Sequence, residues 1–420
     1  MARARSVAII GGGIGGLTVA NALKRIGMSV SLYERAPYFI PTAGAAFGFQ
    51  PNGQISLAHI GFKDQIEKIV HPFYKWQVIN GNCEVVAKTH KLREFGKRFG
   101  YFMGGTIRAE LVDILKEPLE KSGILYYSHN MTNIKQDKDG VAISFDNEKQ
   151  QKTVQVDMVI GADGIHSTVV KQIFTQTAPP IFSKKNIFYG MIDNIDEQTS
   201  INPIVKEKNT MTQGFDHGGF ITFRAGNKGQ CMWAVLYSAD TPPSTNDDAE
   251  WTKMNNQHEL NQCLAKFHQS HPIHECVAAT DKQRLLHFGL YYRQHRNDGW
   301  HRNRICLLGD SCHATLPYVG QGANMAIEDA ISLAMCLEKN NFEMEPAFQE
   351  YYKKRFNRTK RVVNISRYMG LFYHSENSII CSIKLPVISW LINSGMMLKS
   401  LEKEMYGNCP VPIEQKNIVK

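Results

Sequence analysis

Three short apolar runs along the chain are each followed by glycine. They are Ser6 to Ile10, Val156 to Ile160 and Ile305 to Leu308. Short apolar runs bounded by turn residues are typical of buried parallel strands. Because the carboxyl ends of parallel strands meet at one edge of a sheet, the three turns are expected to gather there. In α/β folds this is the edge where ligands bind.

The first run continues into a helix and then a second strand. Apolar side chains recur at helical spacing after the glycines, at Leu17, Ala20, Leu23 and Ile26. Gly27 is well placed to end that helix. Met28 to Tyr33 predicts the next strand, and this strand ends in Glu34.

The turn between the first strand and its helix fits the pattern GxGxxG. Gly11 permits a tight turn, Gly13 lets the backbone approach a pyrophosphate, and Gly16 lets the helix pack closely on the strand. The helix N-terminus supplies free N–H groups and a positive dipole end, and Glu34 is placed to accept hydrogen bonds from a ribose. We predict a dinucleotide site, although this segment does not distinguish NAD from FAD.

Composition narrows the function classes. A chain of 420 residues predicts two or three structural units. With 43% hydrophobic and 21% charged residues it has the composition of a soluble globular protein. A net charge of +9 and a pI near 8.9 could favour a phosphorylated cofactor, an anionic substrate or an acidic membrane surface. The charge is spread out, so nucleic-acid binding is not expected.

The nine cysteines predict neither a disulfide framework nor a zinc site, because no CxxC occurs. Reduced thiols in a cytosolic compartment are the simplest interpretation. The first 22 residues imitate a secretion signal, with a basic start, an apolar run and an Ala-x-Ala site. Five glycines inside the apolar run argue against that interpretation, since glycine is a poor helix former.

The middle of the chain has a different pattern. Gly214 to Phe223 and Gln230 to Tyr237 are β-rich, and the turn AGNKG separates them. This predicts a hairpin of an antiparallel sheet. A polar loop, Thr241 to Asn256, precedes a predicted helix at Glu259 to His268. Beyond residue 345 the pattern is helical.

Two C-terminal segments leave alternatives open. Lys353 to Arg361 resembles a nuclear-localisation run, but apolar positions among its charges favour a solvated helix face. Ile379 to Leu398 is apolar, yet Lys384 and Pro386 interrupt it, so it lacks the span of about 20 apolar residues that a membrane helix needs. We expect a helix packed over the active site or, alternatively, a monotopic membrane contact.

The three glycine turns resemble the motifs of the FAD-dependent aromatic hydroxylases. These are single-component flavoprotein monooxygenases, and they include para-hydroxybenzoate hydroxylase, salicylate hydroxylase and the tetracycline-inactivating monooxygenases. The second turn resembles the family motif GADGxxSxVR, and the third the longer motif GDAAHxxxPxxGQGxNxxxxDA. The third motif is matched at Gly309, Asp310, His313, Pro317, Gly320, Gln321, Gly322, Asn324, Asp329 and Ala330. The resemblance covers roughly residues 5 to 365.

The resemblance implies an α/β fold with a Rossmann-like FAD-binding domain, an inserted antiparallel β-sheet substrate domain and C-terminal helices. The FAD-binding domain would comprise residues 1–175 and 286–345, with some substrate-domain strands near 72–105. The β-sheet substrate domain would be residues 176–285, and the helical segment residues 346–420.

The resemblance also implies noncovalent FAD. Asp310 would hydrogen-bond the ribityl chain, and the loop from Pro317 to Asn324 would pass along the isoalloxazine ring. Glycines there allow close approach of the backbone. The residues expected to bind the cofactor are Gly11, Gly13, Ile14, Gly15, Gly16, Glu34, Arg35, Ala46, Arg108, Asp163, Asp310, Pro317, Gly320, Gly322, Ala323 and Asn324.

The substrate side and the nicotinamide cofactor are less well defined. Phe220, Arg224 and Trp233 are candidates to line the substrate pocket, although strand core is an equal interpretation of these residues. Val170 replaces the usual arginine of the second motif, which leaves NADH versus NADPH open. Cys312 and His313 are adjacent, so their side chains diverge and form neither a nucleophile pair nor a metal site. No catalytic residue or metal ligand is assigned.

The implied activity is that of an NAD(P)H-using monooxygenase. NAD(P)H would reduce FAD, O₂ would add as a C4a-hydroperoxyflavin, and an electron-rich aromatic or polycyclic small molecule would be hydroxylated. The alternatives are a flavin-dependent epoxidase of a terpenoid or lipid at a membrane surface and a non-catalytic binding protein of related fold. A cytoplasmic monomer or homodimer is expected, with peripheral membrane contact through the C-terminal segment as an option.

Overall fold

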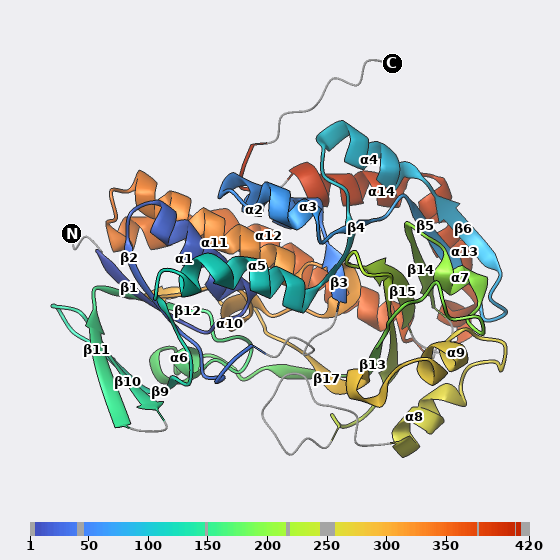
Figure 1. The fold of residues 1–420 in the computed structure, drawn as a ribbon, viewed down its shortest axis with the longest axis horizontal. Helices are drawn as coiled ribbons and strands as arrows, with labels where there is room; N and C mark the ends of the chain where they lie inside the picture. Colours follow the sequence, from blue (N-terminus) through green and yellow to red (C-terminus); the bar gives the residue numbers. More distant parts are fainter. Residues whose placement is uncertain are drawn as a thin grey trace.

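The computed structural model describes residues 5–39, 46–147, 150–215, 219–243, 257–375, 378–407 and 409–412. The polar loop predicted at 241–256 lies mostly outside these residues. Two larger sheets, with helices packed on and between them, make up the described part of the chain (Figure 1).

The first sheet is the predicted parallel sheet. Its strand order is β18-β19-β12-β1-β2-β8, and β1 (Ser6–Ile10) pairs in parallel with both β2 (Ser29–Tyr33) and β12 (Met158–Gly161). β12 pairs in parallel with β19 (Ile305–Leu307), so the three predicted glycine turns leave the sheet at the same edge. The outer strands are β8 (Leu125–Tyr126) and β18 (His301–Arg302), the latter antiparallel.

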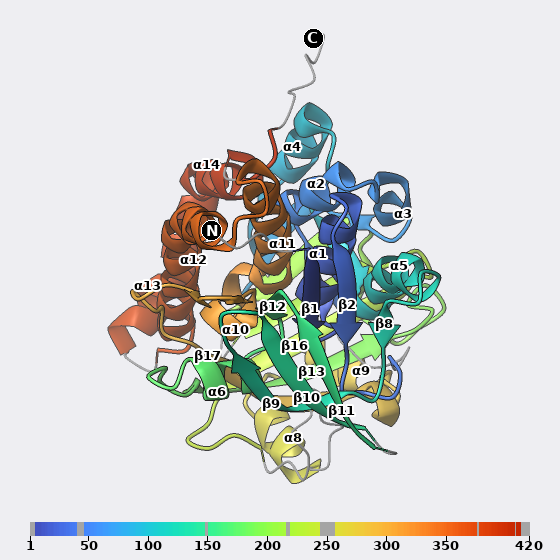
Figure 2. The same ribbon diagram turned by 90° about the vertical axis from the view of Figure 1, so that its left-hand side faces the viewer.

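Helices cover this sheet. α1 (Ile14–Arg25) packs between α5 (Arg108–Glu120) and α11 (Gly322–Lys339). This packing buries the apolar face of α1 almost completely. α12 (Met344–Tyr373) lies against α11 on its outer side (Figure 2). The shorter helices of this part are α2 (Pro51–His59), α3 (Lys63–Glu67), α6 (Thr168–Ile173) and α10 (Asp310–His313).

The second sheet has seven strands in the order β17-β13-β16-β15-β14-β5-β6. The predicted hairpin is present as β15 (Gly219–Ala225) and β16 (Gln230–Ser238). The run from Gly214 to Phe223 is not one strand, because it contains the end of β14 and the start of β15. The remaining strands are β5 (Lys75–Ile79), β6 (Val85–Thr89), β13 (Ile181–Ile192), β14 (Thr210–Gly214) and β17 (Leu286–Tyr292).

The two faces of the seven-stranded sheet belong to different cores. Tyr189, Met191 and Phe223 join the main core, which continues into the parallel-sheet domain. Phe188 and Trp233 point the other way, into a second core closed by short helices. These helices are α7 (Pro203–Lys206), α8 (Gln257–Leu264) and α9 (Ile273–Ala278). Alternation along each strand therefore decides which side chains face the parallel-sheet domain.

Two small sheets and three further helices complete the fold. The sheets are β3 (Ala46–Phe49), β7 (Gly104–Ile107) and β4 (His71–Pro72), and β11 (Gln150–Val156), β10 (Val141–Asn147) and β9 (Asn130–Gln136). The helices are α4 (Lys91–Phe99), α13 (Ser378–Asn393) and α14 (Met396–Glu402), followed by a π-helical turn at Lys403–Gly407. Within the described ranges, no helix combines the length and apolar character needed to cross a membrane.

Candidate functional site

The turn after β1 has the geometry of a phosphate-binding loop. Gly11 has φ +104°, and a Cβ there would lie 2.5 Å from the carbonyl oxygen of Ala162. A Cβ on Gly16 would lie 1.9 Å from the carbonyl oxygen of Gly11, so the close packing of helix on strand requires glycine. Apart from Gly13 itself and its two chain neighbours, no described residue has a heavy atom within 4 Å of the Cβ position at Gly13. The turn therefore has room for a ligand at Gly13.

Glu34 is held at this turn by its own carboxylate. Its Oε2 accepts a hydrogen bond from the N–H of Gly12 at 2.6 Å, and Oε1 accepts one from Ala36 at 2.9 Å. The adjacent Arg35 is exposed. The carboxylate thus lies beyond the carboxyl end of β2, directly beside the glycine loop.

The second motif forms a turn organised by Asp163. Its carboxylate accepts hydrogen bonds from the Ser167 hydroxyl at 2.5 Å and from the N–H groups of Thr168 and Val169 at 2.7 and 3.1 Å. These bonds satisfy the free N–H groups at the start of α6. In this structure Asp163 therefore shapes the loop beside Gly11.

Arg293 connects the second and third motifs, and no pattern in the sequence predicts this role. Its guanidinium donates to the carbonyl oxygens of Ile165 and Ala178, the latter at 3.1 Å, and its N–H donates to Ala314 at 3.0 Å. Its Nε is buried without a hydrogen-bond partner in the described chain. Burial lowers the pKa of this guanidinium from its usual value. Arg293 fixes the spacing of the two loops.

The third motif exposes one acidic side chain at the sheet edge. Gly309 has φ +65°, and Asp310 begins α10 with an exposed side chain, whereas Ser311, Cys312 and His313 are buried. The Ser311 hydroxyl donates to the carbonyl of Gly161 at 2.8 Å and so joins this turn to the one after β12. The side chain of Asp310 therefore faces outward from a turn that the Ser311 hydrogen bond holds in place.

His313 belongs to a buried ion network. Its Nε2 lies 2.5 Å from Oδ2 of Asp329, and Arg355 Nε donates to Oδ1 at 2.6 Å. Arg355 and Arg358 both contact Glu328 at 2.7 Å. Burial alone would raise the pKa of Asp329, but His313 and Arg355 outweigh burial and hold it at about 2.

The side chains of Cys312 and His313 do not diverge as the sequence predicts, because their ligand atoms and that of Asp329 lie within 4.8 Å of one another. Arg355 already places a positive charge on Asp329, so it would oppose a metal cation there. Burial also raises the pKa of the Cys312 thiol well above its ordinary value, which disfavours the thiolate needed as a ligand. The network joins α10, α11 and α12.

Asn324 ties the loop after α10 to strand β3. Its Oδ1 accepts from the N–H of Gln50 at 3.0 Å, and its Nδ2 donates to the carbonyls of Gly48 and Gly320 at 3.0 and 2.8 Å. Gln50 donates in turn to the carbonyl of Val319 at 2.8 Å. These bonds hold two segments side by side where the resemblance places the flavin ring.

The other residues expected at the cofactor lie along these two segments and their surroundings. Pro317 and Gly320 are exposed, Gly322 and Ala323 are half-buried, and Gly320 has φ +61°. Ala46 is buried, and its N–H donates to the hydroxyl of Tyr189 on the second sheet. Arg108 is half-buried and begins α5 directly after β7.

The three substrate-lining candidates lie elsewhere, which corrects that expectation. Phe220 and Trp233 belong to the second core, and Trp233 Nε1 donates to Thr280 at 2.8 Å. Arg224 is buried and pairs with both carboxylate oxygens of Asp196 at 2.9 and 2.7 Å. All three point away from the parallel-sheet domain. The alternation of residues along the strands allowed these side chains to lie on either face of the sheet. The helices after β16 pack on the face where these side chains lie.

A different set of aromatic residues faces the loop of the third motif. Tyr318 lies edge-on to Tyr373 and His374, with ring centroids 6.0 and 5.6 Å apart, and Phe215 packs on Tyr373 at 4.3 Å. The Tyr318 hydroxyl and Nε2 of His374 are buried and lack hydrogen-bond partners within the described ranges. Burial, followed by the charges of Lys185 and Lys384, lowers the pKa of His374 to about 3.

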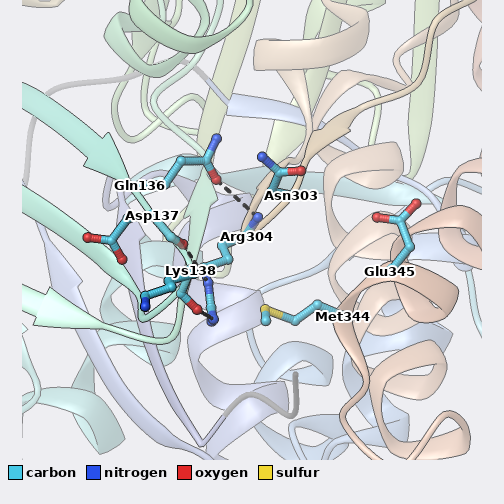
Figure 3. A pocket seen from close by; sticks show the side chains of 7 residues that line it. All are labelled: Gln136, Asp137, Lys138, Asn303, Arg304, Met344 and Glu345. Atoms are coloured by element: carbon cyan, nitrogen blue, oxygen red, sulfur yellow. Dashed lines mark hydrogen bonds between the residues drawn. The ribbon is translucent and has the colours of Figure 1, made fainter. Parts of the chain in front are cut away.

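A hollow of about 360 Å³ lies at the opposite edge of the parallel sheet (Figure 3). Arg304 spans its wall, donating to the carbonyls of Asp137 and Asp157 at 3.2 and 3.1 Å. Asp157 and Arg304 immediately precede β12 and β19, so the hollow is at the amino ends of these strands. It is therefore separate from the glycine turns. Its lining is Gln136, Asp137, Lys138, Asn303, Arg304, Met344 and Glu345.

Comparison with known proteins identifies the family. Residues 4–366 match the FAD binding domain family. The chain is 26% identical over 399 residues to the FAD-dependent monooxygenase ausM of Penicillium brasilianum, covering 89% of this chain and 80% of that protein. It is 28% identical over 376 residues to 3-amino-4-hydroxybenzoate 2-monooxygenase PtmB3 of Streptomyces platensis, covering 88% of each.

Among solved structures, the fold is similar to that of Klebsiella pneumoniae HpxO complexed with FAD and uric acid. The TM-score is 0.83 at 21% identity, covering 96% of this chain and 97% of that one. The chain belongs to the FAD binding domain family, as one of its FAD-dependent monooxygenases. The open position at Gly13 and the outward Asp310 at one sheet edge fit this cofactor.

Proposed function

We propose that FAD lies along the edge formed by the three glycine turns. Its nucleotide end would lie at Gly13 and Glu34, and its ribityl chain at Asp310. The isoalloxazine ring would lie along the segment from Pro317 to Asn324, where α11 points its positive N-terminal end. The room at Gly13 and the exposure of Asp310 at the same sheet edge support this placement.

The proposed reaction is NAD(P)H-dependent hydroxylation of an electron-rich aromatic or polycyclic small molecule. Bound FAD would accept hydride and activate O₂, while the protein positions the substrate and excludes water. The name of the Streptomyces relative, a 3-amino-4-hydroxybenzoate 2-monooxygenase, supports an aromatic substrate. The parallel sheet contains a single GxGxxG turn, which supports transient binding of NAD(P)H at a surface groove.

The substrate proposal rests on a pair of buried polar atoms at the loop from Pro317 to Asn324. An unsatisfied buried polar group costs about 1–3 kcal/mol. The Tyr318 hydroxyl and His374 Nε2 are two such groups, on rings that pack edge-on against each other. A neutral imidazole can donate or accept, so a substrate hydroxyl or carbonyl would satisfy both residues. Phe215 and Tyr373 would then contact the apolar part of the substrate.

The test is substrate-dependent oxidation of NAD(P)H by the FAD-loaded protein, screened against phenols, quinolones, terpenoids and tetracyclines. Wild type should oxidise NAD(P)H slowly alone and several-fold faster with a true substrate. Tyr318→Phe and His374→Gln should raise KM for that substrate while FAD content is unchanged. Tyr38→Phe, an exposed tyrosine outside the site, is the matched control. If both site variants keep the wild-type KM, the substrate does not lie there.

The same site also accommodates an epoxidase acting on a terpenoid or lipid, since both reactions add one oxygen atom. Product structure by NMR separates an epoxide from a phenol or alcohol. We further propose a cytoplasmic location and a monomeric or homodimeric state, which fractionation and light scattering would test. Membrane contact through the C-terminal helices is part of this proposal, and its surface is described next.

A further inference from the structure

The exposed apolar side chains of this protein are concentrated on one surface. Ten large apolar side chains are exposed in the described part of the chain, and eight of them lie between residues 365 and 396. They belong to the end of α12, to α13 and to the start of α14, which lie together on one side of the molecule (Figure 2). We call the exposed side chains of residues 365–396 the C-terminal apolar surface. Monomeric proteins rarely leave such a concentration uncovered.

The helix α13 is apolar on two opposite faces. Ile388 and Ile392 are buried, and the same face is fixed at Lys384, whose Nζ donates to the carbonyl of Tyr373 at 3.0 Å. Ser389 anchors the helix to β6 by donating to the carbonyl of Val86 at 3.0 Å. All of these contacts are made by the inner face of α13.

The outer face of α13 is a continuous stripe at helical spacing. Ile379, Ile383, Val387 and Trp390 follow one another at intervals of four, four and three residues, and all are exposed. Ile379 is 69% and Trp390 59% exposed. A helix that is apolar all round is normally covered on both sides. The outer stripe therefore needs an occupant.

The charge around the surface indicates what the occupant is. Of the nine lysines and arginines between residues 351 and 401, five are buried or paired with carboxylates: Lys354, Arg355, Arg358, Arg361 and Lys384. Lys360, Arg367 and Lys399 are exposed on the elements that carry the surface. A second copy related by a two-fold axis would bring these like charges together, which opposes association. An anionic lipid bilayer offers both an apolar layer for the stripe and negative charge for the basic residues.

We propose that the C-terminal apolar surface seats this protein on an anionic lipid bilayer, with α13 lying in the plane of the membrane interface. Ile379, Ile383 and Trp390 enter the boundary between headgroups and acyl chains, where the amphipathic indole of tryptophan is favoured. Lys360, Arg367 and Lys399 contact the headgroups. The proposal concerns binding and does not rest on the reaction.

Vesicle flotation of the FAD-loaded full chain tests the proposal. Wild type should float with phosphatidylcholine/phosphatidylserine vesicles, more weakly with phosphatidylcholine alone, and less as salt is raised. The double variant Ile383→Glu, Trp390→Glu should weaken binding at least about tenfold, because two apolar side chains no longer enter the bilayer. Tyr38→Glu is the matched control, since Tyr38 is 61% exposed and lies outside the surface.

A charge-reversal pair examines the electrostatic part. Lys360→Glu with Lys399→Glu should weaken binding to the anionic vesicles, whereas Lys135→Glu, on exposed strand β9, should not. FAD content checks that each variant is folded. The proposal is overturned if wild type does not bind anionic vesicles at low salt, or if Tyr38→Glu loses as much binding as the surface variant. It is also overturned if wild type is a dimer that Trp390→Glu splits and no vesicle binding occurs, because the occupant is then a second copy.

Discussion

Asn324 and Gln50 are 274 residues apart in the chain, yet the side-chain oxygen of Asn324 accepts a hydrogen bond from the backbone N–H of Gln50 at 3.0 Å. The same amide donates to the carbonyls of Gly48 and Gly320. One buried side chain thus holds the segment along which the flavin ring is proposed to lie against the end of β3. Asn324 is in this sense a positioning residue.

Asn324→Ala should therefore affect both stability and cofactor affinity. It leaves the Gln50 N–H and two carbonyls without their partner, which should lower the free energy of unfolding by about 2–4 kcal/mol. FAD affinity should fall as well, because the two segments lose their fixed spacing. Chemical denaturation of the apoprotein and FAD titration measure the two effects.

Asn340→Ala is the control for this change. Asn340 also donates to a carbonyl, that of Cys336 at 2.8 Å, but it does so at the far end of α11. It should lower stability slightly and leave FAD affinity unchanged. Equal FAD affinity in Asn324→Ala and wild type would contradict the positioning role.

Asp310→Ala should weaken FAD binding with little loss of stability. The Asp310 side chain is exposed at the sheet edge, so its removal opens no cavity. It would remove a charge-assisted hydrogen bond to the ribityl chain, worth about 1.5–3 kcal/mol, or roughly 10- to 150-fold in affinity. Flavin fluorescence during titration of the apoprotein gives the dissociation constant.

Cys312→Ala provides the contrast to Asp310→Ala, two residues away. Cys312 is fully buried, and its thiol contacts the carbonyl of Gly309. A small residue is retained, so FAD affinity and turnover should change little. Loss of activity in Cys312→Ala with full activity in Asp310→Ala would indicate thiol chemistry and contradict the proposal that this turn binds the flavin.

The pair of His313 and Asp329 should make stability depend on acid pH. The pKa of Asp329 is about 2, below its ordinary 3.8. A depressed pKa means that the unfolded state binds the proton first, so the contribution of Asp329 is complete above about pH 4. It is lost as the pH falls from there toward 2. Unfolding free energies across this range should show the decline.

Asp329→Asn removes the charge that Arg355 and His313 share. Loss of one of the two carboxylates beside the buried Arg355 should cost about 3–5 kcal/mol near neutral pH, because the remaining one, Glu328, also contacts Arg358. The decline between pH 4 and 2 should then be shallower than in wild type. Asp64→Asn, on an exposed part of α3, should change neither quantity. A variant as stable as wild type at neutral pH would show that the network contributes no stability.

The glycine turns were predictable because their chemistry is local. Ser6 to Ile10 was predicted as a strand from five consecutive residues, and it is β1 with the same bounds. The match to GxGxxG needed only Gly11 to Gly16, since turn, helix start and packing contact are all within that segment. The local pattern therefore suffices to predict that the three glycine turns gather at one edge of the parallel sheet, as they do in the structure.

The substrate side was not predictable in the same way. Trp233 is on a strand that alternates correctly, but the choice of face depends on α9, about 40 residues later in the chain. Tyr318 and His374 meet only because the end of α12 returns to the loop before α11. No regular spacing of residues in the sequence predicts such a contact. The sequence pattern therefore indicates Trp233 but not Tyr318 and His374, the two residues that we propose contact the substrate.

The most direct test of the account is the fate of oxygen. The FAD-loaded protein, NAD(P)H and the best substrate from the screen should be incubated under ¹⁸O₂, and the product analysed by mass spectrometry. A monooxygenase should place one ¹⁸O atom in each product molecule, with the other in water. Fully converted product without label, with ¹⁸O only in peroxide or water, would contradict the account and indicate a flavin-dependent reductase or dehydrogenase.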